Sequence, residues 1–151
     1  MSTTENQSYQ PIDILLVDDD LADVKLTKRA LKSGRVANNL HVTNDGVEAM
    51  AFLRGEGQFA GAPRPDLVLL DLNMPRKDGR EVLEEIKSDE QLKTIPVVIL
   101  TTSDADDDVT KSYSRHANSY ITKSLDIEQF NSAICAVTDY WFSVVKLPRK
   151  A

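Results

Sequence analysis

Three short apolar runs, each followed by an Asp or a Thr, constrain the fold of this chain more than any other feature. The runs cover residues 14–17, 67–70 and 97–100. Runs of four residues are too short for buried helices, and β-branched residues are frequent in them, so we predict strands. Because the runs are continuous rather than alternating, both faces of each strand should be covered. Such strands are typical of a parallel sheet between two layers of helices.

The rest of the chain supplies two more strands and five helices. We expect the additional strands, which are more polar, at the edges of the sheet over residues 40–43 and 119–122. Helices are predicted over residues 21–32, 47–54, 79–88, 103–116 and 127–146. Asp20, with Asp23 three residues later, resembles a capping box at the start of the first helix. Strands that alternate with helices in this way predict a doubly wound α/β domain with right-handed crossovers.

Composition narrows the class of protein. We expect residues 1–11, which are polar, to form a flexible segment, and residues 12–151 to form one domain with an extended last helix and a short C-terminal tail. The chain has 18 Lys and Arg against 24 Asp and Glu, which argues against a nucleic-acid partner. It lacks a signal peptide and an apolar run of the roughly 20 residues that span a bilayer, so we expect a cytoplasmic protein without a membrane partner. One cysteine, Cys135, excludes an internal disulfide.

Acidic side chains follow the predicted central strands. The carboxyl ends of parallel strands lie at one edge of a sheet, where ligands bind, so Asp18, Asp19 and Asp71 should meet there. Clustered carboxylates repel one another unless a cation lies among them. Oxygen ligands without a neighbouring His or Cys favour Mg²⁺ over zinc or copper. Thr101 and Lys123 follow the fourth and fifth strands and should lie at the same edge.

This set of side chains suits the chemistry of a phosphoryl group. A metal ion and a lysine neutralise phosphoryl oxygens, a hydroxyl donates a hydrogen bond, and a carboxylate can attack phosphorus. Asp71 is the best candidate nucleophile because it stands alone, whereas the adjacent Asp18 and Asp19 better suit metal binding. Taken singly, each Asp could equally be a helix cap or a loop residue, and Thr101 and Lys123 could be ordinary surface side chains. Their joint occurrence at the strand ends favours the functional interpretation.

The motifs around these residues resemble those of response-regulator receiver domains. The match runs in order, with receiver-like spacing, over about residues 12–146. Its segments are Leu-Val-Asp18-Asp19, Leu-Leu-Asp71-Leu-Asn-Met-Pro75, Asp78-Gly79, Pro96-Val-Val-Ile-Leu-Thr101 and Tyr120-Ile-Thr-Lys123. The resemblance implies a flavodoxin-like fold whose five-stranded parallel sheet has the order 2-1-3-4-5.

The resemblance also implies how the acidic residues act. Asp71 would accept a phosphoryl group from a phosphohistidine on a partner histidine kinase. Mg²⁺, for which Mn²⁺ can substitute, would be held by Asp18, Asp19, Asp71 and the backbone carbonyl of Asn73.

Three further residues would form a switch, again by resemblance. Lys123 would pair with the phosphoryl group, and Thr101 would move toward it, which lets Tyr120 turn inward. Such a switch has two states and is biased by a local change of charge. Without the resemblance, Tyr120 would be an ordinary aromatic residue on an edge strand.

One residue departs from the receiver pattern. Receivers usually follow this lysine with a proline in a cis peptide, whereas here Ser124 follows Lys123. A cis bond before serine costs about 2.5–4 kcal/mol, so we expect a trans bond and a reshaped loop. The Lys-Ser pair, the glycine-rich loop before the third strand and the segment 140–148 are similar to small single-domain regulators paired with bacterial and cyanobacterial phytochrome kinases.

The last predicted helix has two apolar lines. We expect the first to pack on the sheet. It comprises Ile127, Phe130, Ile134, Val137, Trp141 and Val144. The second line should point elsewhere, and we predict that it forms a homodimer interface. It comprises Cys135, Phe142 and Val145, widened by Tyr140. The alternative is that the fourth helix and the tail cover this line within the chain.

Together these features predict a single-domain response regulator that signals by protein–protein interaction. We expect no enzymatic activity beyond accepting and slowly releasing the phosphoryl group, and no small-molecule substrate beyond phosphoryl donors. One alternative is a haloacid-dehalogenase-like phosphatase, which needs an acid two residues after the nucleophile, where this chain has Asn73. The other is a pseudo-receiver that is not phosphorylated, which the full set of site residues disfavours.

Overall fold

The computed structural model describes residues 11–72, 74, 78–101, 119–123 and 126–144, without the side chains of 119, 143 and 144. The predicted helix over 103–116, the Asn73 carbonyl, the Lys123–Ser124 bond and Val145 lie outside the described residues. Residues 1–10 and 145–151 also lie outside them.

Five parallel strands form one sheet in the order β2-β1-β3-β4-β5. The strands are β1 (Ile12–Val17), β2 (Asn38–Thr43), β3 (Leu67–Asp71), β4 (Val97–Thr101) and β5 (Ser119–Thr122). This confirms the predicted strand order and the two edge strands. The central strands are buried almost throughout because helices cover both of their faces, as their continuous apolar runs predict.

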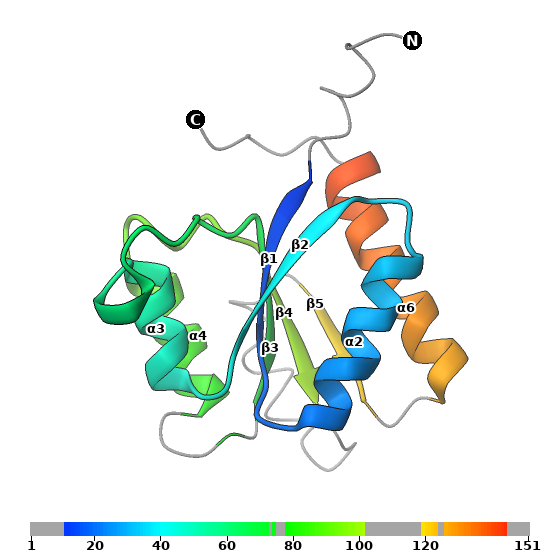
Figure 1. Cartoon of the computed structure of the whole chain (residues 1–151), viewed down its shortest axis with the longest axis horizontal. Helices are drawn as coiled ribbons and strands as arrows, with labels where there is room; N and C mark the ends of the chain where they lie inside the picture. The colour runs from blue at the N-terminus through cyan, green and yellow to red at the C-terminus, as the bar shows by residue number, and fades with distance from the viewer. Residues whose placement is uncertain (1–10, 73, 75–77, 102–118, 124–125, 145–151) are drawn as a thin grey trace, which may run out of the picture.

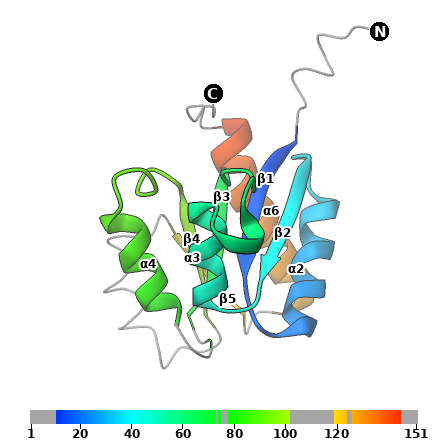
Figure 2. The ribbon, with the colours of Figure 1, turned by 60° about the vertical axis from the view of Figure 1, so that its left-hand side comes forward.

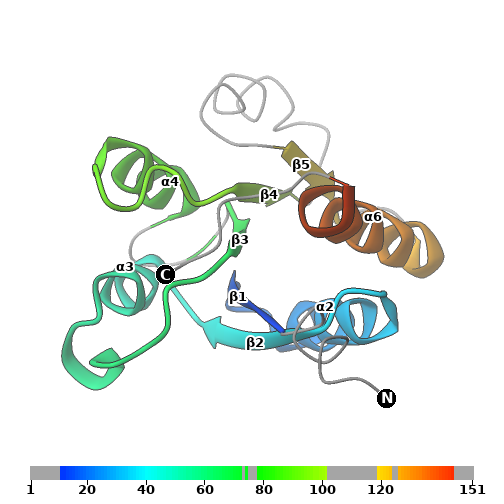
Figure 3. The same cartoon turned by 90° about the horizontal axis from the view of Figure 1, so that it is seen from above.

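Helices form two layers around the sheet. The helices are α2 (Leu21–Ser33), α3 (Gly46–Arg54), α4 (Gly79–Ser88) and α6 (Ile127–Asp139), with short turns η1 (Gly57–Phe59) and η3 (Tyr140–Val144). Figure 1 shows α2 and α6 on one face of the sheet and α3 and α4 on the other. The view in Figure 2 brings α3 and α4 forward, and Figure 3 shows both layers from above. None of the helices in this part of the chain combines the length and the apolar character that a membrane span requires.

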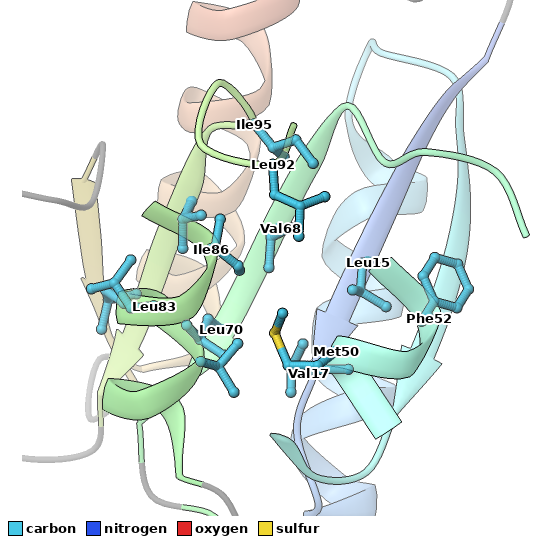
Figure 4. Close-up of a cluster of buried hydrophobic side chains, with 14 of the residues drawn as sticks. Leu15, Val17, Met50, Phe52, Val68, Leu70, Leu83, Ile86, Leu92 and Ile95 are labelled. Carbon is cyan, nitrogen blue, oxygen red and sulfur yellow. The ribbon is translucent and has the colours of Figure 1, made fainter. Parts of the chain in front are cut away.

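Each layer buries its own apolar cluster against the sheet. Figure 4 shows the cluster under α3 and α4, where Met50 and Phe52 from α3 meet side chains of β1, β3 and α4. The second cluster joins α2 and α6 to the opposite face through residues such as Leu31, Phe130 and Ile134. Removal of this apolar surface from water is the main favourable contribution to folding. Packing on both faces therefore stabilises the central strands whose ends carry the acidic residues.

The apolar stripe of the last helix packs on the sheet only in part. Phe130 and Ile134 are buried, but Ile127, at the first position of α6, is 57% exposed. The α-helix ends at Asp139 and continues as a π-helical turn over Tyr140–Val144, whereas the sequence predicts one α-helix to about residue 146.

The second apolar line of the last helix faces the domain more than its spacing predicts. The Cys135 thiol donates to the backbone carbonyl of Ala30 on α2, with the sulfur 3.5 Å from the oxygen. Phe142 is half-buried and packs against the second apolar cluster. Both side chains therefore contact their own chain: Cys135 because α6 lies directly against α2, and Phe142 through the second cluster. Tyr140 is the exposed member of the described candidates, at 53%.

Candidate functional site

The sheet brings three carboxylates together. Asp18 follows β1 and Asp71 ends β3, and these strands are neighbours. Asp18, Asp19 and Asp71 each offer a carboxylate oxygen, and these oxygens lie within 4.8 Å of one another. Asp18 and Asp71 are buried, whereas Asp19 is exposed. The cluster lies at the carboxyl edge of the sheet, as the sequence predicts.

Lys123 reaches into this cluster from the end of β5. Its Nζ is 2.8 Å from Asp18 Oδ2 and 3.3 Å from Asp71 Oδ2, and its side chain is only 7% exposed. Its backbone N–H donates to the carbonyl of Thr101 at the end of β4. The lysine backbone is thus attached to the sheet while the ammonium lies among the carboxylates.

A fourth carboxylate, Asp23, also binds Lys123, with its Oδ2 2.9 Å from Nζ. The predicted capping box forms only in part, since the Asp20 side chain accepts the N–H groups of Ala22 and Asp23 as an N-cap. The Asp20 N–H, however, donates to Asp18 Oδ1, and the Asp23 carboxylate binds the lysine. A hydrogen bond between two charged groups is stronger than one to a neutral group, which explains why the Asp23 carboxylate binds the Lys123 ammonium rather than the Asp20 N–H.

The sequence alone does not identify Asp23 as a site residue. The available signal was an acidic residue in the first turn of the helix that follows the acidic strand end. An acid at that position is equally explained by the helix dipole, so the signal does not distinguish the two roles.

Burial and charge act in opposite directions on the two central ionisable groups. For Asp18, burial raises the pKa above its usual value, and the hydrogen bonds from Lys123 and from the Asp20 N–H oppose this only in part. For Lys123, burial alone would lower the pKa. The carboxylates of Asp18, Asp23 and Asp71 outweigh that effect and raise the pKa above the ordinary lysine value. The lysine is therefore a fixed positive charge in the site.

The two remaining predicted switch residues lie on β4 and β5. Thr101 is buried, and its Oγ1 has no hydrogen-bond partner among the described residues. It follows Leu100, which pairs with Asp71, so it lies at the same edge as the carboxylates. Tyr120 is 39% exposed on the edge strand β5. The structure thus combines a buried hydroxyl near the site with an aromatic ring that is accessible to solvent.

A close backbone approach supports the segment after Asp71. The Gly79 N–H at the start of α4 donates to the carbonyl of Leu72, at 3.0 Å. A Cβ atom at Gly79 would lie 2.2 Å from the carbonyl oxygen of Asp71, so no other residue fits without a shift of the backbone. The Asp78 side chain caps this helix by accepting the N–H groups of Arg80 and Glu81.

The donor set fits a hard divalent cation. The candidate ligands Asp18, Asp19 and Asp71 are all carboxylates, the donors that such ions prefer. Two of the three are buried, and among the described residues the ammonium that contacts them is that of Lys123, so these side chains together carry an excess of negative charge that a cation would neutralise. This matches the class of metal expected from the sequence.

Comparisons with known proteins agree with this geometry. Residues 14–135 match the model of the response regulator receiver domain. The chain is 46% identical over 143 residues to the response regulator Rcp1 of Synechocystis sp., and the match covers 95% of this chain and 97% of Rcp1. It is 40% identical over 146 residues to the probable methanogenesis regulatory protein FilR2 of Methanothrix harundinacea, covering 96% and 93% of the two chains. These relatives are regulators rather than enzymes.

Solved structures of phytochrome response regulators are similar over nearly the whole chain. The phosphorylated cyanobacterial phytochrome response regulator RcpA is 49% identical with a TM-score of 0.84, and the match covers 93% of this chain and 100% of RcpA. The Mn²⁺-bound form of Rcp1 is 47% identical with a TM-score of 0.82, covering 92% and 100%. The sheet order, the acidic edge and these matches agree, and the chain therefore belongs to the response regulator receiver domain family.

Proposed function

We propose that this chain is a phosphorylatable switch in two-component signalling, with Asp71 as the phosphoryl acceptor. The observation that supports this is the position of Asp71: a buried carboxylate at a central strand end, grouped with two further carboxylates and 3.3 Å from the Lys123 ammonium. A carboxylate oxygen of Asp71 attacks the phosphorus of a phosphohistidine. The new P–O bond forms as the P–N bond breaks, and the imidazole leaves with the electron pair.

Mg²⁺ is the proposed cation, held by Asp18, Asp19, Asp71 and the backbone carbonyl of Asn73. Mn²⁺ can substitute, in agreement with the Mn²⁺-bound form of the relative Rcp1. When bound, the cation neutralises charge on the phosphoryl oxygens. Asn73 lies outside the described residues, so its contribution follows from the family resemblance.

Lys123, Thr101 and Tyr120 form the proposed response to phosphorylation. The ammonium of Lys123, which remains charged, pairs with a phosphoryl oxygen. The Thr101 hydroxyl, without a partner among the described residues, donates a hydrogen bond to another. Tyr120 then turns from its exposed position toward the space that Thr101 leaves, which changes the surface near β5.

The proposed partners are a phytochrome-type sensor histidine kinase and a second copy of this chain. The kinase assignment is supported by the named phytochrome response regulators among the similar structures. The signal would pass by protein–protein interaction in the cytoplasm, without nucleic acid or membrane binding. A homodimer would form through the last helix, where Tyr140 is exposed and where Cys135, Phe142 and Val145 were the other candidates.

One experiment tests the phosphoryl acceptor. The protein is incubated with Mg²⁺ and acetyl phosphate, and its intact mass is measured before and after hydroxylamine treatment. A phosphoryl adduct that hydroxylamine removes, and that Asp71→Asn lacks, is the expected result. Rapid turnover of phosphomonoesters would instead favour the phosphatase, and the absence of an adduct in the folded protein would favour the pseudo-receiver.

A further inference from the structure

Three carboxylates surround the Lys123 ammonium, and one of them lies outside the cation cluster. Nζ is 2.8 Å from Asp18 Oδ2, 2.9 Å from Asp23 Oδ2 and 3.3 Å from Asp71 Oδ2. Asp18 and Asp71 belong, with Asp19, to the group of oxygens that could hold a cation. Asp23 does not belong to that group, so it can bind the lysine while a cation occupies the others.

The ammonium and a cation would compete for the same two carboxylates, those of Asp18 and Asp71. In Asp18, Oδ1 already accepts the N–H of Asp20 at 2.9 Å, and Oδ2 accepts from Lys123. A cation that binds Asp18 and Asp71 weakens two of the lysine's three contacts. Because the lysine side chain is 7% exposed, an ammonium left without replacement partners would be a buried, unpaired charge, which is strongly unfavourable.

The start of α2 fixes the backbone of Asp23. It lies in the first turn of α2, where its N–H donates to the Oδ1 atom of the N-cap Asp20 at 3.2 Å. Its side chain is 31% exposed, whereas those of Asp18 and Asp71 are 0% and 4% exposed. Asp23 is thus at the rim of the site, where the ammonium can stay when the interior carboxylates bind something else.

We propose that Asp23 is a positioning residue for Lys123. Its carboxylate keeps the ammonium at the rim of the site while a divalent cation takes Asp18 and Asp71, and so keeps the lysine within reach of an incoming phosphoryl group. The inference rests on the proposed function for the cation site. A purely structural ion pair between α2 and the end of β5 would change stability, but it would leave the cation affinity unchanged apart from a general charge effect.

Mg²⁺ titration by calorimetry separates these two roles. The variants are Asp23→Ala, which removes the acceptor, and Asp23→Asn, which keeps a neutral one. Asp20→Asn is the matched control, because it removes one charge from the same helix start and Asn is an equally good N-cap. Loss of the charge-assisted contact should weaken Mg²⁺ binding about tenfold in Asp23→Ala. The effect should be smaller in Asp23→Asn and smallest in Asp20→Asn.

A double-mutant cycle attributes the effect to the lysine. In a Lys123→Met background no ammonium has to be displaced, so Asp23→Ala should weaken Mg²⁺ binding no more than Asp20→Asn does. Circular dichroism checks that each variant is folded. If Asp23→Ala weakens binding equally with and without Lys123, the positioning role is wrong.

A second readout follows the ammonium directly and needs Lys123→Met only to assign the signal. Lysine NH₃⁺ protons held by carboxylates exchange slowly with water, so the ¹⁵N-labelled Lys123 ammonium should give an NMR signal. In the wild type and in Asp20→Asn, this signal should persist at saturating Mg²⁺. In Asp23→Ala it should be present without Mg²⁺ and lost when Mg²⁺ is added.

Failure of the inference and failure of the proposed function give different results. If Mg²⁺ binds and the Lys123 signal persists in Asp23→Ala, the cation site stands and the role of Asp23 is overturned. If the folded wild type binds no Mg²⁺, the proposed cation site is wrong and the role of Asp23 falls with it. In that case the signal in metal-free Asp23→Ala still shows whether Asp23 contributes to holding the lysine.

Discussion

At the scale of single residues, the site depends on opposite charges that are buried together. Asp18 and Asp71 are almost completely inaccessible, and an isolated carboxylate in such a place would tend to become neutral. Lys123 supplies the compensating charge, and its own pKa is raised because several carboxylates face it. Burial thus favours the neutral form of Asp18, and the nearby ammonium of Lys123 opposes this effect.

Gly79 allows a prediction at this scale. Gly79→Ala would place a Cβ atom 2.2 Å from the Asp71 carbonyl oxygen, so the backbone around Asp71 must move. Overpacking of this kind costs about 1–3 kcal/mol, and we expect this loss in urea unfolding together with slower phosphorylation by acetyl phosphate. The control is Gly34→Ala, because a Cβ atom at Gly34 would lie 3.3 Å from its nearest neighbour, the Sγ atom of the Cys135 side chain. If the two variants slowed phosphorylation equally, the close approach of Gly79 to Asp71 would not be the cause of the slower reaction.

The sequence predicts which residues lie together at the strand ends, but it does not predict all of the ion pairs that they form. Asp18, Asp71 and Lys123 stand at or directly after the carboxyl ends of predicted strands, and parallel topology alone brings such positions to one edge. The pairing of Asp23 with Lys123 joins residues 100 positions apart, and it depends on competition between a helix cap and a charged partner. Local sequence patterns indicate the helix cap but not the distant charged partner. Of the predicted capping box, the Asp20 cap is therefore correct, and the return bond from the Asp23 side chain is wrong.

At the scale of elements, boundaries follow from caps and from burial. β1, β3 and β4 contain the continuous apolar runs and extend one or two residues beyond them, and Asp20, Asp45 and Asp78 cap the helices that follow strand ends or loops. The change from α to π geometry after Asp139 was not predictable from periodicity, because the apolar spacing continues unchanged through residues 137–144.

Lys87, near the end of α4, allows a prediction of pH dependence. Its Nζ donates to the carbonyls of Lys93 and Ile95 in the connection to β4, and burial lowers its pKa below the ordinary 10.5. Between the lowered pKa and 10.5 the unfolded chain binds more protons than the folded one, so stability rises with pH in that window. The free energy of unfolding of the wild type should therefore increase relative to Lys87→Met as the pH rises through this window. Urea unfolding at several alkaline pH values measures the difference, and a constant difference would contradict the assignment.

At the scale of the whole molecule, the two helical layers differ in what they leave exposed. The α3 and α4 layer closes over the first apolar cluster, and an ion pair between Arg54 and Glu85, 3.5 Å apart, joins the two helices at the surface. The α2 and α6 layer buries Cys135 and Phe142 in part but leaves Ile127 and Tyr140 exposed. The partner surface predicted for the last helix is therefore narrower than its sequence indicates, and Tyr140 is the residue at which to test it.

Tyr140→Glu should convert a dimer into a folded monomer. The side chain is 53% exposed, so a change to Glu should alter the free energy of unfolding of the monomer by about 0.5 kcal/mol or less. In a dimer, the same change would bury a carboxylate without a partner and oppose association. Light scattering coupled to size-exclusion chromatography measures the mass. Phe142→Glu is a poorer test, because Phe142 packs against the chain's own apolar cluster and its loss would destabilise the fold.

Val47→Glu is the matched control for this experiment, since Val47 is 48% exposed on α3, in the opposite layer. A dimer through the last helix requires that Val47→Glu keep the mass of the wild type while Tyr140→Glu halves it. Dissociation by Val47→Glu alone would move the interface to the α3 and α4 layer. A wild type that has the monomer mass both with and without phosphorylation would show that Tyr140 is a solvent-exposed side chain of a monomeric switch. The outcome thus decides whether the exposed surface at Tyr140, at the start of η3, joins two copies of the chain or remains available to a different protein.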